Sequence, residues 1–330
     1  MKRLCTLAVL VVLTTAGCAV GGETKTEASE TYPSKPLSIL APGSPGGGWD
    51  TRARGIANAL GQCKITSQKA TVTNVPGAGG TIGLAQFAKH NGDPYQLMVM
   101  DSATMLGGIV NNHSPVDLTT LTPIAGLSRG PSAIVVPKKS PYADLPALLA
   151  ALKQNPRGIK WTGGSLGGPG HLTVAGLAKG AGVGVKDVNY VPTAGGGESM
   201  NLLLSGAATV GIDTVVELKP QIQAGALRVL AVDGSDRVEG VDAPTLKELG
   251  LADKAVTTLA GVMAPAGLSA EQQKDVIGLL DKMRQSSCWQ QVLKQNNWVD
   301  AWTPGDDFKT VLTDQRTQIT AILTEMGLAK

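Results

Sequence analysis

Short apolar runs rich in valine, isoleucine and leucine recur along the chain, and glycine- and proline-containing segments separate them. Runs of this length and composition are typical of buried β-strands. We expect strands at Leu37–Ala41, Ala70–Val75, Gln96–Met100, Ala133–Pro137, Ile159–Thr162, Val188–Val191, Val210–Ile212, Arg228–Val232 and Leu259–Ala264.

Segments with apolar residues at helical spacing lie between most of these runs, and signals such as Ser269 before Ala270 and Gly250 after Leu249 mark their ends. We expect helices at Thr51–Leu60, Thr81–Lys89, Leu145–Asn155, His171–Gly180, Gly197–Ser205, Val216–Ala224, Pro244–Leu249, Ala270–Gln285, Ser287–Asn296 and Pro304–Met326. The alternation predicts an α/β fold with parallel sheets that are covered by helices on both faces. Ligands of such sheets bind beyond the carboxyl ends of the strands.

Glycine-rich loops follow several of the predicted strands at that edge. The first is Pro45-Gly46-Gly47-Gly48-Trp49-Asp50, and others lie at 76–83, 163–167 and 192–198. Glycine lets the backbone approach a ligand closely, and the helix that follows offers unpaired N–H groups and a positive dipole end. A carboxylate suits such a site, although an isolated loop of this kind is also consistent with a simple tight turn. Several such loops without catalytic residues predict binding rather than catalysis.

The loop at 76–83 imitates a dinucleotide-binding motif, with Asp101 downstream. Its spacing is GxGxxxG rather than GxGxxG, and it does not follow the first strand of the chain. We therefore expect no nicotinamide cofactor. No paired histidine or cysteine spacing indicates a metal site either.

The loop Gly163–Gly167 matches the GxSxG motif of serine hydrolases, with Ser165 as the nucleophile. A hydrolase also needs a histidine base, and the chain has His90, His113 and His171, of which only His171 lies downstream. A secreted serine hydrolase is therefore an alternative function. The simpler interpretation of Ser165 is a loop hydroxyl that donates a hydrogen bond to a ligand or a carbonyl group.

The N-terminus is typical of an export signal, because Lys2 and Arg3 precede an apolar run that ends at Leu13. Cys18 directly follows Ala-Gly, as in a bacterial lipoprotein cleavage site, which predicts a signal peptide at 1–17 and lipidation of Cys18. Plain secretion is the alternative. The polar residues 18–31 then form a flexible tether, and the folded part is extracytoplasmic and anchored to the membrane.

Loss of the signal and lipidation leave Cys63 and Cys288 as the remaining cysteines. An even pair in an oxidising compartment suggests a disulfide, and two buried free thiols are the alternative. The formal net charge is +3 and aromatic residues make up 3% of the chain, so nucleic acid is not an expected partner.

Several segments together resemble one family, the extracytoplasmic solute-binding proteins of tripartite tricarboxylate transporters, also called Bug proteins. The residues that carry the resemblance are Tyr32-Pro33-Ser34-Lys35-Pro36 (family YPxKP), Pro45 to Asp50 (PGGGTD), Asn74 to Gly80 (NRPGAGG), Asp93 to Leu97 (DGYTL), His171-Leu172 (HL), Val191-Pro192 with Gly195-Gly196 (VPYKGG) and Ala264 to Gly267 (APAG). Each motif is short, but their order and spacing together are specific.

The resemblance implies a type II periplasmic-binding-protein fold, in which two α/β domains are joined by a two-strand hinge with a ligand cleft between them. Domain 1 is then 32–131 plus 257–330, and domain 2 is 132–256. Such a protein carries no cofactor and no catalytic residues, and a monomer is expected. It captures a small organic acid, such as a di- or tricarboxylate, and delivers it to a membrane permease with a large and a small subunit. A binding lipoprotein that acts as a sensor without a transporter is an alternative.

The resemblance also implies ligand contacts through backbone amides and bridging waters at loops of both domains. Carried over by position, the ligand-binding residues are Ser44, Gly46, Gly47, Gly48, Trp49, Asp50, Ser102, Ala103, Thr104, Ser165, Leu166, Gly167, Thr193, Asp213 and Thr214. We expect Asp50 to cap its helix and to orient the loop rather than to contact the anion, because a bare carboxylate would repel it.

The chain departs from the family pattern at several of these positions. Trp49 replaces a usual threonine and either narrows the cleft, stacks on a ring or simply packs. Arg52 replaces an apolar residue, Thr193-Ala194 replace Tyr-Lys, and Ser165 replaces a frequent glycine. These departures affect the expected substrate and not the expected fold.

Overall fold

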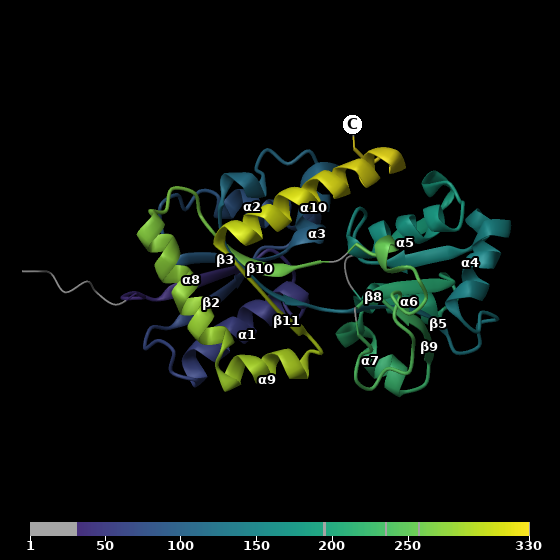
Figure 1. The fold of residues 1–330 in the computed structure, drawn as a ribbon, viewed down its shortest axis with the longest axis horizontal. Helices are drawn as coiled ribbons and strands as arrows, with labels where there is room; N and C mark the ends of the chain where they lie inside the picture. The colour runs from purple at the N-terminus through teal and green to yellow at the C-terminus, as the bar shows by residue number, and fades with distance from the viewer. Residues whose placement is uncertain (1–31, 194–195, 235, 257, 330) are drawn as a thin grey trace, which may run out of the picture. The chain divides into compact units, whose positions relative to one another are not determined.

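Two mixed β-sheets, each covered by helices on both faces, make up the part of the chain that the structure describes (Figure 1). The computed structural model describes residues 32–193, 196–234, 236–256 and 258–329. The predicted signal peptide, tether and lipidated Cys18 lie outside the described residues. Tyr32–Lys330 is one compact unit by its contacts. The α/β class with two sheets is confirmed.

The first sheet has the strand order β11-β4-β10-β3-β1-β2. Its strands are β1 (Leu37–Ala41), β2 (Ala70–Asn74), β3 (Gln96–Asp101), β4 (Thr122–Arg129), β10 (Ala260–Ala264) and β11 (Val299–Pro304). β1 pairs in parallel with β2 and β3, whereas β10 is antiparallel to both of its neighbours. The prediction of purely parallel sheets was therefore wrong. The chain forms the second sheet before it returns to the first one. β10 therefore enters the first sheet at the carboxyl end of β3 and runs antiparallel to it.

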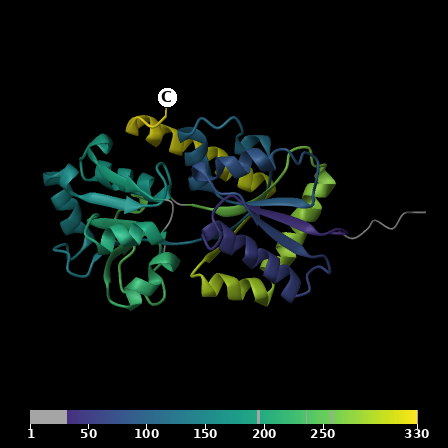
Figure 2. The same cartoon turned by 180° about the vertical axis from the view of Figure 1, so that it is seen from behind.

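Helices cover this first sheet on both faces, as the reverse view shows (Figure 2). The helices of the first lobe, by which we mean this sheet and its helices, are α1 (Gly48–Gln62), α2 (Thr81–Phe87), α3 (Ser102–Asn111), α8 (Ala270–Arg284), α9 (Ser287–Gln295) and α10 (Gly305–Met326). One apolar core lies between the sheet and α1, α8 and α9, around Trp289. The other lies between the sheet and α2, α3 and α10, around Phe87 and Phe308.

The second sheet has the strand order β7-β6-β8-β5-β9. Its strands are β5 (Ser132–Pro137), β6 (Lys160–Gly163), β7 (Asn189–Pro192), β8 (Val210–Thr214) and β9 (Leu227–Val232). Its helices are α4 (Leu145–Gln154), α5 (Pro169–Gly180), α6 (Gly196–Leu204) and α7 (Val215–Gln223), and with the sheet they form the second lobe. One core includes Trp161 with α4 and α5, and the other includes Leu218 with α6 and α7. Short 3₁₀ helices lie at Ala78–Gly80, Leu118–Thr120, Pro156–Gly158, Val185–Asp187 and Ala252–Lys254.

The chain passes between the two sheets twice. Gly130 and Pro131 connect β4 to β5, and the residues after β9 lead back to β10. The strands of the two sheets thus come from the ranges predicted for domains 1 and 2. Because Tyr32–Lys330 is one compact unit by contacts, the domain boundaries at 131/132 and 256/257 stay a prediction.

Most predicted elements form within a few residues of their expected bounds, and the differences have local causes. The predicted helix at Pro244–Leu249 is a turn, in which Thr245 pairs with Val232. Ser102–Thr104 were expected to form a ligand loop, whereas they are the first turn of helix α3, which was not predicted; two glycines in the middle of this helix weaken its local pattern. Strands β4 and β11 were not predicted. Pro123 and Gly126 interrupt the apolar pattern of β4, and β11 is a half-exposed strand at the edge of the sheet.

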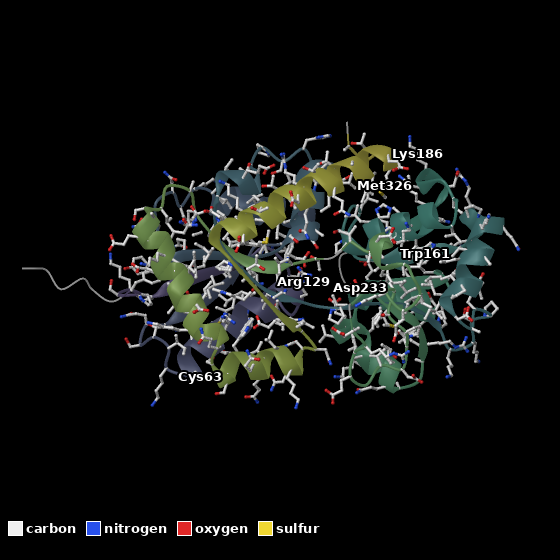
Figure 3. The ribbon with its side chains drawn as sticks, viewed as in Figure 1. Cys63, Arg129, Trp161, Lys186, Asp233 and Met326 are labelled. Carbon is white, nitrogen blue, oxygen red and sulfur yellow. A yellow bond between two sulfur atoms is a disulfide. The ribbon has the colours of Figure 1, made fainter. Side chains whose placement is uncertain are left out.

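Cys63 and Cys288 are joined by a disulfide. The bond links the C-terminal end of α1 to the start of α9, at the side of the first lobe where Figure 3 labels Cys63. The alternative of two free thiols therefore does not hold for this structure.

Candidate functional site

The first glycine loop leads directly into α1, which begins three residues earlier than predicted, at Gly48. Gly47 is the N-cap and provides no side-chain cap, so the expectation that Asp50 caps the helix as its N-cap was wrong. Asp50 instead lies in the first turn, where Oδ2 accepts a hydrogen bond from the Gly46 N–H at 2.8 Å. A carboxylate there reaches back to an amide of the loop, one residue before the N-cap, and so holds the loop against the helix.

Asp50 is buried, with 3% of the residue exposed. Arg54 Nε donates to the same Oδ2 at 2.9 Å. Burial by itself would raise the pKa of Asp50, but the hydrogen bonds from Arg54, Gly46 and Asn74 together lower it. Oδ1 is buried and has no hydrogen-bond partner among the described residues.

Trp49 packs against glycines on both sides of it. A Cβ added to Gly43 would lie 3.0 Å from the Trp49 ring, and a Cβ added to Gly80 would lie 2.8 Å from it. Gly80 has φ +92°, so both its conformation and this contact require glycine. Trp49 thereby joins the first glycine loop to the second one and belongs to the cores on both sides of the sheet. Its ring is engaged in packing in this structure.

The predicted second ligand loop, Ser102–Thr104, is the first turn of α3. Asp101 is the N-cap, and its carboxylate accepts from both the N–H and the hydroxyl of Thr104. Ser102 is fully buried, and its Oγ accepts from the Leu259 N–H at 3.0 Å. Ala103 is fully buried in the core. Ser102 thus holds the end of β3 against the segment that leads into β10, and ligand contact by the three residues stays a prediction.

The loop Ser165–Gly167 lies opposite α3. A Cβ on Gly107 of α3 would meet the Gly167 carbonyl oxygen at 2.1 Å, so the two lobes touch here through glycine backbones. The Gly167 N–H donates to His171 Nδ1 at 3.1 Å, and the His171 ring stacks on Tyr190. Burial lowers the pKa of His171 to about 4, which leaves the imidazole neutral at pH 7.

Thr193, Asp213 and Thr214 lie at the carboxyl ends of the second sheet. Thr193 is buried, and its N–H and Oγ1 both donate to the Gly163 carbonyl. Asp213 Oδ2 accepts from Ser199 Oγ, and Thr214 Oγ1 donates to Glu217 Oε2 at 2.8 Å.

Burial raises the pKa of Asp213 to about 7, and Glu217 adds to this effect while the bond from Ser199 opposes it. Asp213 is therefore a carboxyl group at the end of β8 that stays protonated to a higher pH than an exposed aspartate does.

A cavity of about 410 Å³ opens between the two lobes. It is lined by Ala78, Gly79, Gly108, Asn111, Asn112, Ser165, Leu166, Pro192, Thr193 and Glu198. Ser165, Leu166 and Thr193 were predicted as ligand residues. The remaining predicted residues lie in the first loop (Ser44, Gly46, Gly47, Gly48, Trp49 and Asp50), at the start of α3, at Gly167 and at the end of β8, and do not line this cavity.

Sequence reasoning missed most of the residues that line the cavity. Gly79, Pro192 and Glu198 belong to glycine loops that the sequence does mark, so the signal for them was present. Asn111 and Asn112 end α3, the helix that was not predicted, so no sequence signal pointed to them.

The described residues give little support to enzyme chemistry at this cavity. His171, the histidine nearest to Ser165 in sequence, has its Nδ1 occupied by the Gly167 N–H. Within the described residues, no group of three or more histidine, cysteine, aspartate or glutamate side chains is arranged to hold a metal ion. The same residues contain no helix that is long and apolar enough to span a bilayer.

Residues 53–328 match the model of one protein family, the tripartite tricarboxylate transporter family receptor. Protein BugT of Bordetella pertussis is 31% identical over 272 residues, which cover 81% of this chain and 80% of that protein.

Solved structures agree with this match. A TctC solute-binding protein from Polaromonas, with no ligand, has a TM-score of 0.70 and 28% identity, over 89% of this chain and all of that chain. MatC from Rhodopseudomonas palustris, with bound malate, has a TM-score of 0.74 over 88% of this chain and all of that chain. At 20% identity, this second likeness concerns the fold.

Proposed function

Because the chain belongs to the tripartite tricarboxylate transporter receptor family, we propose that it captures a small organic carboxylate outside the cytoplasm and delivers it to a membrane permease. The family is one of solute receptors rather than enzymes. The ligand is a di- or tricarboxylate or a similar acid, held without covalent chemistry. Lipid on Cys18 keeps the receptor at the membrane, and the large and small subunits of the permease accept the ligand.

The observation that carries this proposal is the cavity between the lobes, lined largely by small residues and amides. Gly79 and Gly108 bring backbone close to the space, and Asn111 and Asn112 bring side-chain amides. Helices α5 and α6 begin just after Ser165-Leu166 and Thr193, so their positive ends are near the same space. Amide donors and helix ends suit a carboxylate.

The bound malate of MatC supports the class of ligand, because malate carries two carboxylates and MatC shares this fold. The volume supports it as well. A cavity of about 410 Å³ accommodates a small acid, and ordinary ligand sites span roughly 300–1,000 Å³. Closure of the two lobes over the acid would exclude water and strengthen the hydrogen bonds to it.

Thermal unfolding of the chain in the presence of malate, succinate and citrate tests the proposal. A ligand at about one hundred times its Kd adds roughly 2.7 kcal/mol to the free energy of unfolding. We expect at least one of these acids to raise the melting temperature and the neutral diamide of malate to leave it unchanged. If isothermal titration detects binding of none of the acids, the proposal is wrong.

A further inference from the structure

The loop Gly163–Gly167 forms part of the wall of the cavity between the lobes. Ser165 and Leu166 of this loop line the cavity, and both are half-buried. The loop connects the end of β6 to the start of α5. Two ring side chains, His171 and Tyr190, hold its two ends, and the proposed function does not yet use them.

Tyr190 holds the first end of the loop. It lies on β7, which pairs in parallel with β6, and its hydroxyl donates to the Gly164 carbonyl at 3.1 Å. Burial and the nearby Asp213 raise the pKa of Tyr190, so the hydroxyl keeps its proton and remains a donor. A Cβ on Gly163 would lie 2.7 Å from this hydroxyl. The glycine at position 163 therefore leaves room for the tyrosine to reach the loop.

His171 holds the other end of the loop. It lies in the first turn of α5, is buried, and its Nδ1 accepts from the Gly167 N–H at 3.1 Å. An acceptor at Nδ1 requires a neutral imidazole with its proton on Nε2. Burial lowers the pKa of His171 to about 4, and the positive end of α5 also disfavours a cation in this turn. The bond anchors Gly167 at φ +74°, a conformation that favours glycine.

The two rings are in contact with each other and connect the two anchors. Their centroids are 4.2 Å apart, and the ring planes are inclined by 21°. The contact joins β7 to α5, so the hydrogen bonds at Gly164 and Gly167 are held at a fixed separation. Ser165 and Leu166, the residues that line the cavity, lie between these anchors.

We propose that His171 and Tyr190 are positioning residues for ligand binding, which hold the loop Gly163–Gly167 so that Ser165 and Leu166 face the ligand in the cavity. This inference rests on the proposed function. A loop that is already ordered loses little conformational freedom when a ligand binds, which raises the affinity. Without the acceptor of His171, the buried Gly167 N–H lacks a partner, and the loop rearranges to find one.

Two substitutions at His171 separate the hydrogen bond from the ring contact. His171→Asn places Oδ1 near the position of Nδ1 and keeps an acceptor without the ring. His171→Phe keeps a ring against Tyr190 and removes the acceptor. We expect ligand affinity to fall roughly tenfold in His171→Phe and about threefold at most in His171→Asn. If the pair acts through packing alone, the order of the two variants is reversed, which contradicts the inference.

The affinities are measured by isothermal titration with the acid, among malate, succinate and citrate, that the wild type binds most tightly. Tyr190→Phe keeps the ring contact and removes the bond to Gly164, and its affinity should fall by roughly three- to tenfold. Tyr142→Phe is the matched control, because Tyr142 packs against the same apolar core and does not line the cavity. We expect this control to bind as the wild type does.

The protonation of His171 in the wild type gives a readout that needs no variant. ¹⁵N spectra of histidine-labelled protein are recorded at about pH 5.5, between the ordinary pKa of 6.5 and the value of about 4 for His171. We expect a neutral ring with its proton on Nε2. If no histidine of the chain is in that state at this pH, His171 does not accept from Gly167 and the inference is wrong.

The outcomes separate the two proposals. A wild-type chain that binds none of the acids contradicts the proposed function itself. Equal affinities of the wild type and a folded His171→Phe, with folding judged by the melting temperature, overturn the positioning role and leave the proposed function intact.

Discussion

Burial shifts the pKa values of Asp213, at the end of β8, and of Arg52, on α1. Asp213 lies at the end of β8, with Glu217 close by and Ser199 donating to it. Burial acts on both residues in the same physical way, because it disfavours the charged form. For Asp213 the result is a pKa of about 7, so its charge changes near neutral pH. For Arg52 the charge remains.

We predict that Asp213→Asn stabilises the chain at pH 8 and has little effect at pH 4. The folded pKa of Asp213, about 7, lies above the unfolded value of 3.8, so its contribution to stability is complete below pH 4 and is lost as pH rises through 7. At pH 8, the free energy of unfolding of Asp213→Asn should exceed that of the wild type by on the order of 1–2 kcal/mol. This value already includes a reduction for screening by the solvent that reaches the residue. Melting temperatures of both proteins between pH 4 and 8 measure it.

Asp187→Asn is the control for this titration, because Asp187 is exposed and pairs with Arg157 at the surface. Its effect on stability should be small at both pH values. An equal effect of Asp213→Asn at pH 4 and pH 8 would show that the pKa of Asp213 is not raised.

At the scale of elements, helix α1 connects the first glycine loop to the disulfide. It begins at the glycine loop, carries Asp50, Arg52 and Arg54 in its first turns, and ends at Cys63. The disulfide to Cys288 then fixes that end to α9. The bond closes a segment of the chain with a sequence separation of 225, which includes the entire second lobe. Such a cross-link restricts the unfolded chain strongly.

We predict that replacing both Cys63 and Cys288 with serine lowers the free energy of unfolding by about 2–4 kcal/mol, because the unfolded chain gains freedom. Urea denaturation of the two proteins measures the change. Dithiothreitol should lower the stability of the wild type to that of the double variant and leave the double variant unchanged. An equal effect of the reductant on both proteins would contradict a stabilising disulfide.

At the scale of the whole described unit, contacts between the lobes lie on either side of the crossovers. Helix α10 of the first lobe reaches the second lobe, where Lys179 pairs with Glu325 at 2.8 Å. Figure 3 labels Lys186 and Met326 at this end of α10, and a Cβ added to Gly327 would lie 3.6 Å from Lys186 Cε. Elsewhere, Lys219 Nζ of α7 donates to Asn297 Oδ1 at 2.8 Å, next to the Trp298 that stacks on Arg52.

We predict that Gly107→Ala destabilises the chain and weakens ligand binding, because a Cβ at 2.1 Å from the Gly167 carbonyl oxygen would push α3 and its opposing loop apart. The loss of stability should be about 1–3 kcal/mol. Gly278→Ala is the matched control, since Gly278 also lies within a helix but has no atom within 4 Å of an added Cβ. That variant should gain about 0.5–1 kcal/mol from helix propensity.

Thermal unfolding and titration with malate measure both effects. Equal stability changes for the two variants would mean that the lobes do not touch through Gly107.

The sequence by itself determined the α/β class, the order of most elements and the glycine loops, because these depend on apolar runs, helical spacing and residues that interrupt them. It did not reveal α3, β4 and β11, since glycines, a proline and an exposed edge weaken their local patterns. Only the tertiary structure placed Gly107 against Gly167 and brought Arg52 to Ser128 and Trp298. Those contacts join residues far apart in the chain, and they depend on how strands and helices pack rather than on any local preference.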